Sequence, residues 1–260
     1  MKPSDFEAHC KEIGPWVNWE NTTDVVLHGD PEIEVSSIAV TWLATDAVIE
    51  EAARLGCNFL ISHEGIYYPT FKKHASEQQH HAAKQALLDE KGITVFRCHD
   101  TWDRMPSVGI CDTWADFLGW DSSPRDTESY YKVCDVAGQS GTGVADQVLE
   151  RIETLGQSSI QLMGDLDVDV SRLAIGTGAI TRLPAMQELG ADILLASDDG
   201  THTTYCGLWS FDLGIPVIIV CHSTSELPGM IALSEYVPTI FPDVAVHYLP
   251  CGLPSTRTLT

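Results

Sequence analysis

Apolar and polar positions in the first half of the chain alternate between short buried strands and amphipathic helices. Residues 37–43 form an apolar run, residues 46–55 repeat apolar side chains at helical spacing, and a β-rich apolar run follows at 59–61. A second helical pattern over 76–90 precedes a strand pattern over 93–98. Because short strand-helix-strand connections are right-handed, this order predicts parallel strands in one sheet.

The second half repeats the alternation after the polar, aperiodic segment 122–129. The pattern predicts strands near 131–136, 160–163, 172–175, 192–196, 216–220 and 245–249, and helices near 144–155, 184–189 and 227–236. The predicted fold class is α/β, with two α/β lobes and mainly parallel sheets. We place the lobes at 1–125 and 126–235, and expect the segment 236–260 to return to the first lobe.

Three predicted strands end in segments that each carry a histidine and a nearby carboxylate. These segments are Ser62-His63-Glu64, His99-Asp100-Thr101-Trp102-Asp103 and His222-Ser223-Thr224-Ser225-Glu226. Polar side chains at the carboxyl ends of parallel strands lie where open α/β sheets place their active sites. Imidazole and carboxylate donors together suit Zn, Fe, Mn or Ni. The three segments therefore predict a metal site.

Spacing indicates which of these side chains converge. His99 and Asp103 are four residues apart, as are His222 and Glu226, a separation that brings two side chains together on one helical turn or tight loop. Asp103 is preferred over Asp100 for this reason, although Asp100 remains the alternative ligand. His99 and Asp100 are otherwise candidates for orienting the ligands.

His63 and Glu64 are adjacent, so both face one cavity only if the backbone turns, as Gly65 would allow. A pair of metal ions about 3.5–4 Å apart needs a bridging carboxylate and further donors on each ion, and lowers the pKa of a bridging water from about 15.7 toward 7. Five donors meet this need: His63, Glu64, Asp103, His222 and Glu226. Glu64 or Glu226 is also a candidate general base if metal does not occupy it fully.

The chain of 260 residues carries a formal net charge of -22, with 37 acidic and 15 basic side chains. Such a charge repels a phosphate backbone, since nucleic-acid affinity comes mostly from Lys and Arg that displace counterions. Duplex nucleic acid is therefore not expected as a partner. No window approaches the roughly 18 apolar residues of a membrane span, and no signal-peptide pattern opens the sequence. We expect a cytoplasmic protein without membrane contact.

The eight cysteines are scattered and form no CxxC pair. We predict that they are reduced and mostly buried, because a chain of this length can build its own core without disulfides. Cys98 and Cys221 each precede a candidate site histidine. Their place at the inner end of a strand favours the role of a small hydrophobe over that of a metal ligand.

The turn Gly176-Thr177-Gly178 follows a predicted strand and could cradle a phosphate with its backbone N–H groups. It lacks the third glycine of the dinucleotide fingerprint. The pattern therefore favours a tight strand-to-helix turn over a phosphate site.

Several motifs in order resemble one family. The run Asn58–Tyr68 resembles the "ISHHP" or "HEPTFY" motif of the YbgI-like dinuclear metal centre proteins, also labelled GTP cyclohydrolase type 2. Val95–Asp103 is similar to the family's "HTxxD" or "RxHD" segment. Downstream, Gly176–Gly178, residues 190–202 and residues 214–226 follow the family's C-terminal order.

The resemblance extends from about Val25 to about Val246. It implies a YbgI-like fold of two lobes, a site for two divalent metal ions and a homohexamer. The positions it matches to metal ligands are His63, Glu64, Asp103, His222 and Glu226, and it places His202 in a motif beside the site. The chain departs from the family at Glu64, where a His is usual and where an anionic donor should favour a harder metal. It departs again at Gly65, where a Pro is usual.

Together these features predict a dinuclear divalent-metal-binding protein that acts as a metal-dependent hydrolase. The expected substrate is small and phosphorylated or nucleotide-like. The alternative is a metal-binding, metal-delivery or scaffold protein without turnover. No residue pattern identifies a substrate pocket, so the sequence leaves this choice open.

Overall fold

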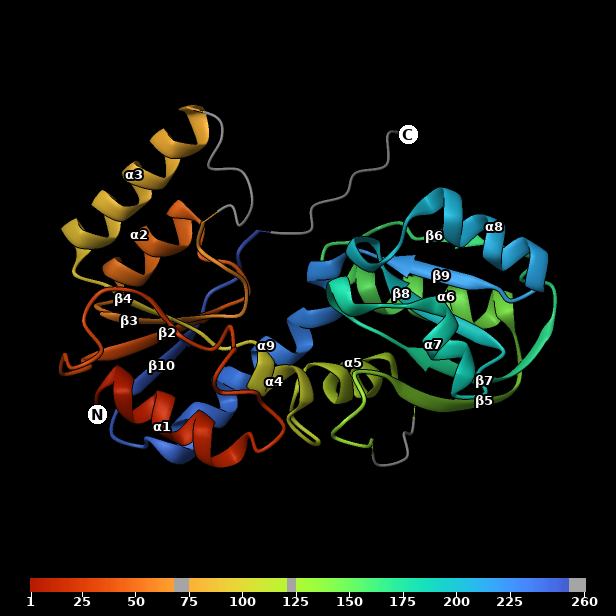
Figure 1. Ribbon diagram of the computed structural model, residues 1–260, viewed down its shortest axis with the longest axis horizontal. Coiled ribbons are helices and arrows are strands. Elements are labelled where there is room, and N and C mark those ends of the chain that lie inside the picture. The colour runs from red at the N-terminus through yellow and green to blue at the C-terminus, as the bar shows by residue number, and fades with distance from the viewer. Residues whose placement is uncertain (68–74, 121–124, 253–260) are drawn as a thin grey trace. The chain divides into compact units, whose positions relative to one another are not determined.

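The computed structural model describes residues 1–67, 75–120 and 125–252. These residues form two compact units, each with a five-stranded sheet and mostly parallel strands (Figure 1). The predicted α/β class with two mainly parallel sheets is thereby confirmed. One unit combines Met1–Met105 with Met230–Cys251, and the other contains Pro106–Gly229.

The first unit has the strand order β1-β4-β3-β2-β10. Its strands are β1 (Val26–His28), β2 (Ser37–Thr41), β3 (Phe59–Ser62), β4 (Thr94–Arg97) and β10 (Ala245–Tyr248). All neighbours are parallel except β1, which pairs antiparallel with β4. The C-terminal strand β10 thus lies beside β2 at one edge of the sheet formed by the N-terminal part of the chain.

Helices cover both faces of this sheet (Figure 1). They are α1 (Pro3–Ile13), α2 (Asp46–Arg54), α3 (Ala75–Lys91), the short α4 (Asp100–Arg104) and the later turns of α9 (His222–Ile240). Leu60 and Val95 pack in one cluster with apolar residues of α2 and α3. On the other face Phe6 of α1 contacts the rings of Phe59 and Phe96 edge to face. Successive strand residues therefore serve opposite faces, as the period of a buried strand requires.

The second unit has the strand order β5-β7-β8-β9-β6. Its strands are β5 (Lys132–Ser140), β6 (Gln161–Met163), β7 (Asp169–Ile175), β8 (Ile193–Ser197) and β9 (Val217–Val220). The central strands β7, β8 and β9 are parallel, whereas the edge strands β5 and β6 pair antiparallel. The central strands are the ones that end beside candidate functional residues.

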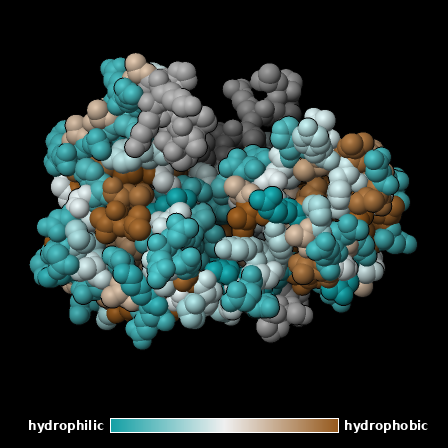
Figure 2. All heavy atoms as spheres, viewed as in Figure 1, coloured by the Kyte–Doolittle hydropathy of each residue, from teal (hydrophilic) through white to brown (hydrophobic). Residues whose placement is uncertain are grey.

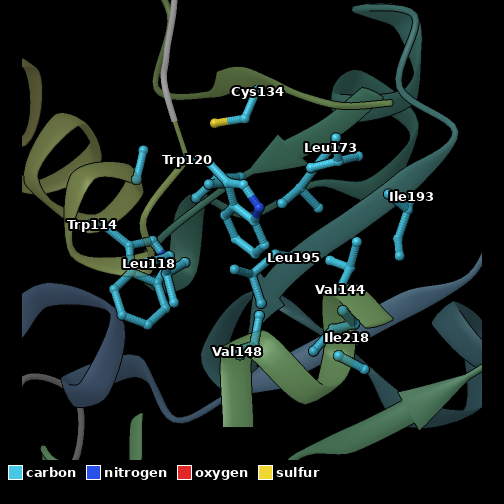
Figure 3. Packing of buried hydrophobic residues seen from close by; sticks show 14 of the residues in the cluster. Trp114, Leu118, Trp120, Cys134, Val144, Val148, Leu173, Ile193, Leu195 and Ile218 are labelled. Atoms are coloured by element: carbon cyan, nitrogen blue, oxygen red, sulfur yellow. The ribbon is translucent and has the colours of Figure 1, made fainter. Parts of the chain in front are cut away.

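This second sheet also lies between two layers of helices. The helical segments are α5 (Ile110–Leu118), α6 (Gly141–Glu153), η1 (Gly178–Ile180), α7 (Leu183–Glu188), η2 (Asp198–Gly200), α8 (Thr203–Leu213) and the first turns of α9. Figure 3 shows Trp114 of α5 and Val148 of α6 in one apolar cluster with Leu195 of β8. Trp209 of α8 packs against the cluster on the opposite face, which contains Leu194.

The units divide the chain earlier than the predicted boundary at residue 125. Residues 106–120 belong to the second unit, because α5 packs against α6 and β5 there. Part of the polar segment 122–129 lies outside the described residues, as does Tyr68 of the family-like motif. The sequence pattern also gave no indication of α1, α5 or α8, and for α4 it indicated only one helical turn or a tight loop.

Helix α8 shows why such an element is hard to predict. It presents large apolar side chains to solvent, namely those of Tyr205, Leu208, Phe211 and Leu213, and Figure 2 shows hydrophobic surface over this helix. Apolar residues on all sides of a helix leave no stripe of helical period for sequence reasoning to detect. Within the described residues, no helix is long and apolar enough to cross a membrane.

Candidate metal centre

His63 is positioned at the end of β3, where its ring is fully buried. Its Nδ1 lies 3.0 Å from the carbonyl oxygen of Cys98, which can only accept a hydrogen bond, so Nδ1 carries the proton. In a neutral ring the Nε2 atom is then an acceptor, and it lies 3.4 Å from Oδ1 of Asp103. Two acceptors at this distance repel each other unless a cation, either a proton or a metal ion, lies with them.

His99 joins this pair from the neighbouring strand. Register places Ser62 of β3 beside Arg97 of β4, so the residues that follow the two strands emerge side by side. The rings of His63 and His99 stack with centroids 4.5 Å apart and an interplanar angle of 12°. Nδ1 of His99 lies 3.3 Å from Oδ2 of Asp103. Sequence reasoning favoured an orienting role for His99, and the structure brings its ring into the same candidate donor group as His63 and Asp103.

His63, His99 and Asp103 therefore form one group that could hold a metal ion, with donor atoms all within 4.8 Å of one another. The group combines two imidazoles with one carboxylate, a donor set suited to borderline transition ions. Asp103 Oδ1 is buried and takes part in no hydrogen bond with the described residues. A buried carboxylate oxygen that accepts no hydrogen bond is suited to bind a cation.

The electrostatics of this group favour positive charge. Burial disfavours the charged form of the His99 ring, but the carboxylate of Asp103 and the hydrogen bond with Asp100 together outweigh it and raise the pKa of His99 above its ordinary value. Burial would also raise the pKa of Asp100, but hydrogen bonds with His99 and with Thr23 hold this pKa well below its usual range. Asp100 is therefore a carboxylate at neutral pH.

Asp100 anchors the backbone rather than joining the donor group. Its Oδ2 accepts hydrogen bonds from Thr22 Oγ1 at 2.8 Å and from Thr23 N at 2.9 Å. Its Oδ1 accepts from Thr23 Oγ1 and lies 3.1 Å from Nδ1 of His99. The geometry thus brings Asp103, and not Asp100, together with His63, in line with the preference from spacing.

Asp24 is a functional candidate that sequence reasoning missed. It is almost fully buried, and its Oδ1 accepts hydrogen bonds from the backbone N–H groups of His99 and Asp100, each at 2.7 Å. Its Oδ2 accepts from Thr101 N at 2.9 Å. One carboxylate therefore fixes the first turn of α4, which carries His99 and Asp103. No motif marks Asp24, because its partners lie about 75 residues further along the chain.

Glu64 is held by an arginine. Arg97 Nη2 donates to Glu64 Oε2 at 3.0 Å, and Arg97 Nε donates to the carbonyl oxygen of His63 at 3.0 Å. This guanidinium fixes the turn after β3 and neutralises one carboxylate oxygen of Glu64. Arg97 therefore restrains the Glu64 carboxylate beside the backbone of His63.

The thiols near the candidate donors are neutral. A hydrogen bond with Cys10 and complete burial hold the pKa of Cys98 well above its ordinary value. Burial likewise raises the pKa of Cys221. Among the described residues, neither cysteine belongs to a donor group that could hold a metal ion, in line with the role of a small hydrophobe. None of the eight cysteines forms a disulfide.

The second unit carries its own imidazole and carboxylate pair at the start of α9. His222 Nε2 lies 2.9 Å from Glu226 Oε2, as expected for residues four apart on a helical turn. His222 Nδ1 lies 2.9 Å from Asp199 Oδ2, and the backbone N–H of His222 donates to Asp198 Oδ1 at 2.7 Å. Asp199 thereby fixes the orientation of the His222 ring, a role that sequence reasoning did not assign to it.

The position of Gly178 shows why the turn after β7 requires a glycine. Its φ is +61°, and a Cβ at this position would lie 2.7 Å from Glu226 Oε1 and 2.9 Å from His222 Nε2. The carbonyl oxygen of Gly178 accepts a hydrogen bond from Ser197 Oγ at 2.6 Å. The glycine therefore permits a close approach of the backbone to the His222 and Glu226 side chains. This geometry fits the predicted tight turn.

Substitution of Gly178 by alanine should displace the His222 and Glu226 side chains. We expect the free energy of unfolding to fall by about 3 kcal/mol, since left-handed strain and a steric clash act together. Gly214→Ala is the matched control, because Gly214 has a similar φ of +67° but no atom within 4 Å of its added Cβ. Urea denaturation of both variants measures the difference. An equal fall in the free energy of unfolding of both variants would show that the close approach of the Gly178 backbone to Glu226 does not affect stability.

The fold and the site together define a class: two-unit α/β proteins with histidine and carboxylate donors at the ends of parallel strands. The chain belongs to the Duf34/NIF3 (NGG1p interacting factor 3) family, whose model matches residues 1–251. The resemblance to the YbgI-like proteins is thereby confirmed. The chain is 25% identical over 250 residues to a "GTP cyclohydrolase 1 type 2 homolog" of Clostridium perfringens, covering 91% of each chain. It is 24% identical to the protein of that name from Clostridium acetobutylicum, covering 90% of this chain and 89% of the relative.

Solved structures share the fold over the whole chain. A hypothetical protein of Staphylococcus aureus superposes with a TM-score of 0.79 at 17% identity, covering 100% of this chain and 99% of the other. The protein ybgI, described as of unknown function, gives a TM-score of 0.79 at 18% identity, covering 99% and 100%. Reduced HcgD from Methanocaldococcus jannaschii gives 0.71 at 19% identity, covering 96% and 98%. At these identities the likeness concerns the fold alone.

Proposed function

We propose that this protein binds two divalent cations in a dinuclear centre and hydrolyses a small phosphorylated or nucleotide-like substrate with their help. One observation carries the proposal: His63 donates through Nδ1 to a backbone carbonyl and turns its acceptor Nε2 toward the buried carboxylate of Asp103. In metal-ligating histidines in general, a hydrogen bond from the ring nitrogen that does not bind the metal fixes the tautomer.

The proposed ligands are those expected from the sequence, with His99 added. They are His63, Glu64, His99, Asp103, His222 and Glu226. Imidazole and carboxylate are the donors that Zn, Mn, Fe and Ni accept. The family resemblance extends the proposal to a homohexamer, which sedimentation of the 28.5 kDa chain would report.

Divalent ions in such a donor set act as Lewis acids and lower the pKa of water from about 15.7 toward 7. The protein's own part is to orient the reactants and to accept a proton. Glu64 and Glu226 are both candidates for the general base, with one oxygen of Glu64 bound by Arg97 and one oxygen of Glu226 lying 2.9 Å from His222 Nε2. The name of the clostridial relatives makes GTP one substrate to test.

Elemental analysis of protein purified without chelators tests the metal proposal. We expect close to two transition ions per chain after supply of Zn, Mn or Fe. A chain that stays free of metal under all three conditions contradicts the proposal. Turnover requires a separate screen of the metal-loaded protein against GTP, other nucleotides and phosphodiesters, with Glu226→Gln as the inactive variant. Transfer of metal to an apo-acceptor without any turnover would favour metal delivery instead.

A further inference from the structure

A pocket of about 500 Å³ opens within the second unit, between α7 and α8. This volume lies in the range that small-molecule sites occupy, about 300–1,000 Å³. Its apolar lining includes Leu183 and Pro184 of α7 and Cys206 and Trp209 of α8. Leu183 is buried, and Trp209 packs against the same apolar cluster, so the floor of the pocket is part of the core.

The rest of the lining is aromatic or charged. His202 and Tyr205 join Trp209, and the rings of His202 and Tyr205 lie 5.2 Å apart at 54°. Arg182 and Glu188 also line the pocket. The ion pairs of the described residues in the second unit do not include Arg182, although acidic side chains outnumber basic ones 37 to 15 in this chain. Aromatic walls suit a flat ring, and an uncompensated guanidinium suits an anionic group on it.

The pocket adjoins the His222 and Glu226 pair through one packed turn. Thr181 lines the pocket, and its Oγ1 donates to the carbonyl oxygen of Gly178 at 3.0 Å. Gly200 also lines the pocket, and a Cβ there would lie 2.9 Å from the same carbonyl oxygen. Gly178 in turn contacts the Glu226 carboxylate closely enough to exclude a Cβ. A ligand in the pocket would therefore be separated from His222 and Glu226 only by the backbone of the turn at Gly178.

We propose that this pocket binds a heteroaromatic ring that carries an anionic group, such as a nucleoside monophosphate. The ring stacks on Trp209 and Tyr205, the guanidinium of Arg182 pairs with the phosphate, and the Glu188 carboxylate accepts hydrogen bonds from ring N–H groups. The inference rests on the proposed function, for which the pocket is the substrate's aromatic subsite. Guanosine monophosphate is the apt probe, because adjacent N–H donors on the guanine edge match a carboxylate.

Calorimetric titration of the full-length protein treated with EDTA tests the pocket without metal. We expect guanosine monophosphate to bind with a Kd below 1 mM as an order-of-magnitude limit, and both guanosine and ribose 5-phosphate to bind at least about tenfold more weakly. The absence of binding by guanosine monophosphate at millimolar concentration overturns the inference. Equal affinity for ribose 5-phosphate overturns it as well, because the ring would then contribute nothing.

Substitutions in the pocket lining test whether guanosine monophosphate binds there. Arg182→Gln and Trp209→Leu should each weaken binding about tenfold. The matched controls are Arg151→Gln, an exposed arginine on α6, and Phe211→Leu, an exposed aromatic residue on α8 outside the pocket lining. Arg182 is exposed, so its variant keeps the test valid if Trp209→Leu unfolds. Equal losses in the controls would place the ligand elsewhere.

The metal-free titration separates this inference from the proposed function. Binding of guanosine monophosphate without turnover by the metal-loaded protein would contradict the hydrolase and leave the pocket supported. Turnover of nucleotides by the loaded protein, with no change in Arg182→Gln or Trp209→Leu, would support the hydrolase and contradict the pocket.

Discussion

Replacement of His63 by alanine should lower the affinity of the protein for divalent metal by at least about 100-fold. Loss of a residue that merely orients a ligand already costs 10-fold to 100-fold in metal affinity, and His63 is a proposed ligand itself. Its imidazole is fully buried, with Nε2 3.4 Å from Asp103 Oδ1, so the alanine variant removes a nitrogen donor from beside that carboxylate. Competition with a chromogenic chelator measures the affinity.

His28→Ala is the matched control for this variant. His28 also lies in the first unit and also faces a carboxylate, with Nε2 3.0 Å from Asp89 Oδ1, but Asp89 is exposed to solvent. We expect its metal affinity to equal that of the unchanged protein. Asp103→Asn provides a second variant of nearly unchanged volume in case His63→Ala unfolds. Full metal binding by both His63→Ala and Asp103→Asn would contradict the proposed centre.

Asp24→Asn should destabilise the protein by about 3 kcal/mol and weaken metal binding about 10-fold to 100-fold, although Asp24 is not a ligand. The carboxylate accepts hydrogen bonds from three successive backbone N–H groups, those of His99, Asp100 and Thr101. An amide presents an N–H group to at least one of these donors, and two donors cannot satisfy each other. The turn that positions His99 and Asp103 should then loosen.

Asp30→Asn provides the control for Asp24→Asn. Asp30 is exposed, and its side chain accepts a hydrogen bond from the backbone N–H of Glu32 at 2.9 Å. Exposed substitutions of this kind change stability by no more than about 0.5 kcal/mol. Urea unfolding with EDTA measures stability without metal, and chelator competition measures affinity. If Asp24→Asn bound metal like the unchanged protein, the carboxylate would serve the fold alone.

The strands that carry the candidate site were predictable because their signals are local. Residues 59–61 and 93–98 are apolar runs that end in polar residues, and β3 and β4 occupy these positions. A buried parallel strand needs apolar side chains on both faces, so it is visible in the sequence as a continuous apolar run. Helix α4 has only five residues, too few for a period to emerge, and α8 has apolar residues on all sides.

The ligand candidates also include some that sequence spacing identified and others that only the fold brought together. Histidine and carboxylate spacing indicated that Asp103 is a better donor than Asp100, because four residues span one helical turn. The same spacing could not show that His99 stacks on His63, since their contact depends on the pairing of two strands. Asp24 was invisible to sequence reasoning for the same reason.

The sequence by itself determined the α/β class, the family and the chemical identity of the candidate donors at the strand ends. These properties depend on the local order of apolar and polar residues, which each segment carries independently of the rest of the chain. Only the tertiary structure decided that His63, His99 and Asp103 form one group, that Gly178 makes room for Glu226, and that α7 and α8 enclose a pocket. Those outcomes require residues far apart in the chain to meet, and hydrophobic burial and strand register bring them together only when the units fold.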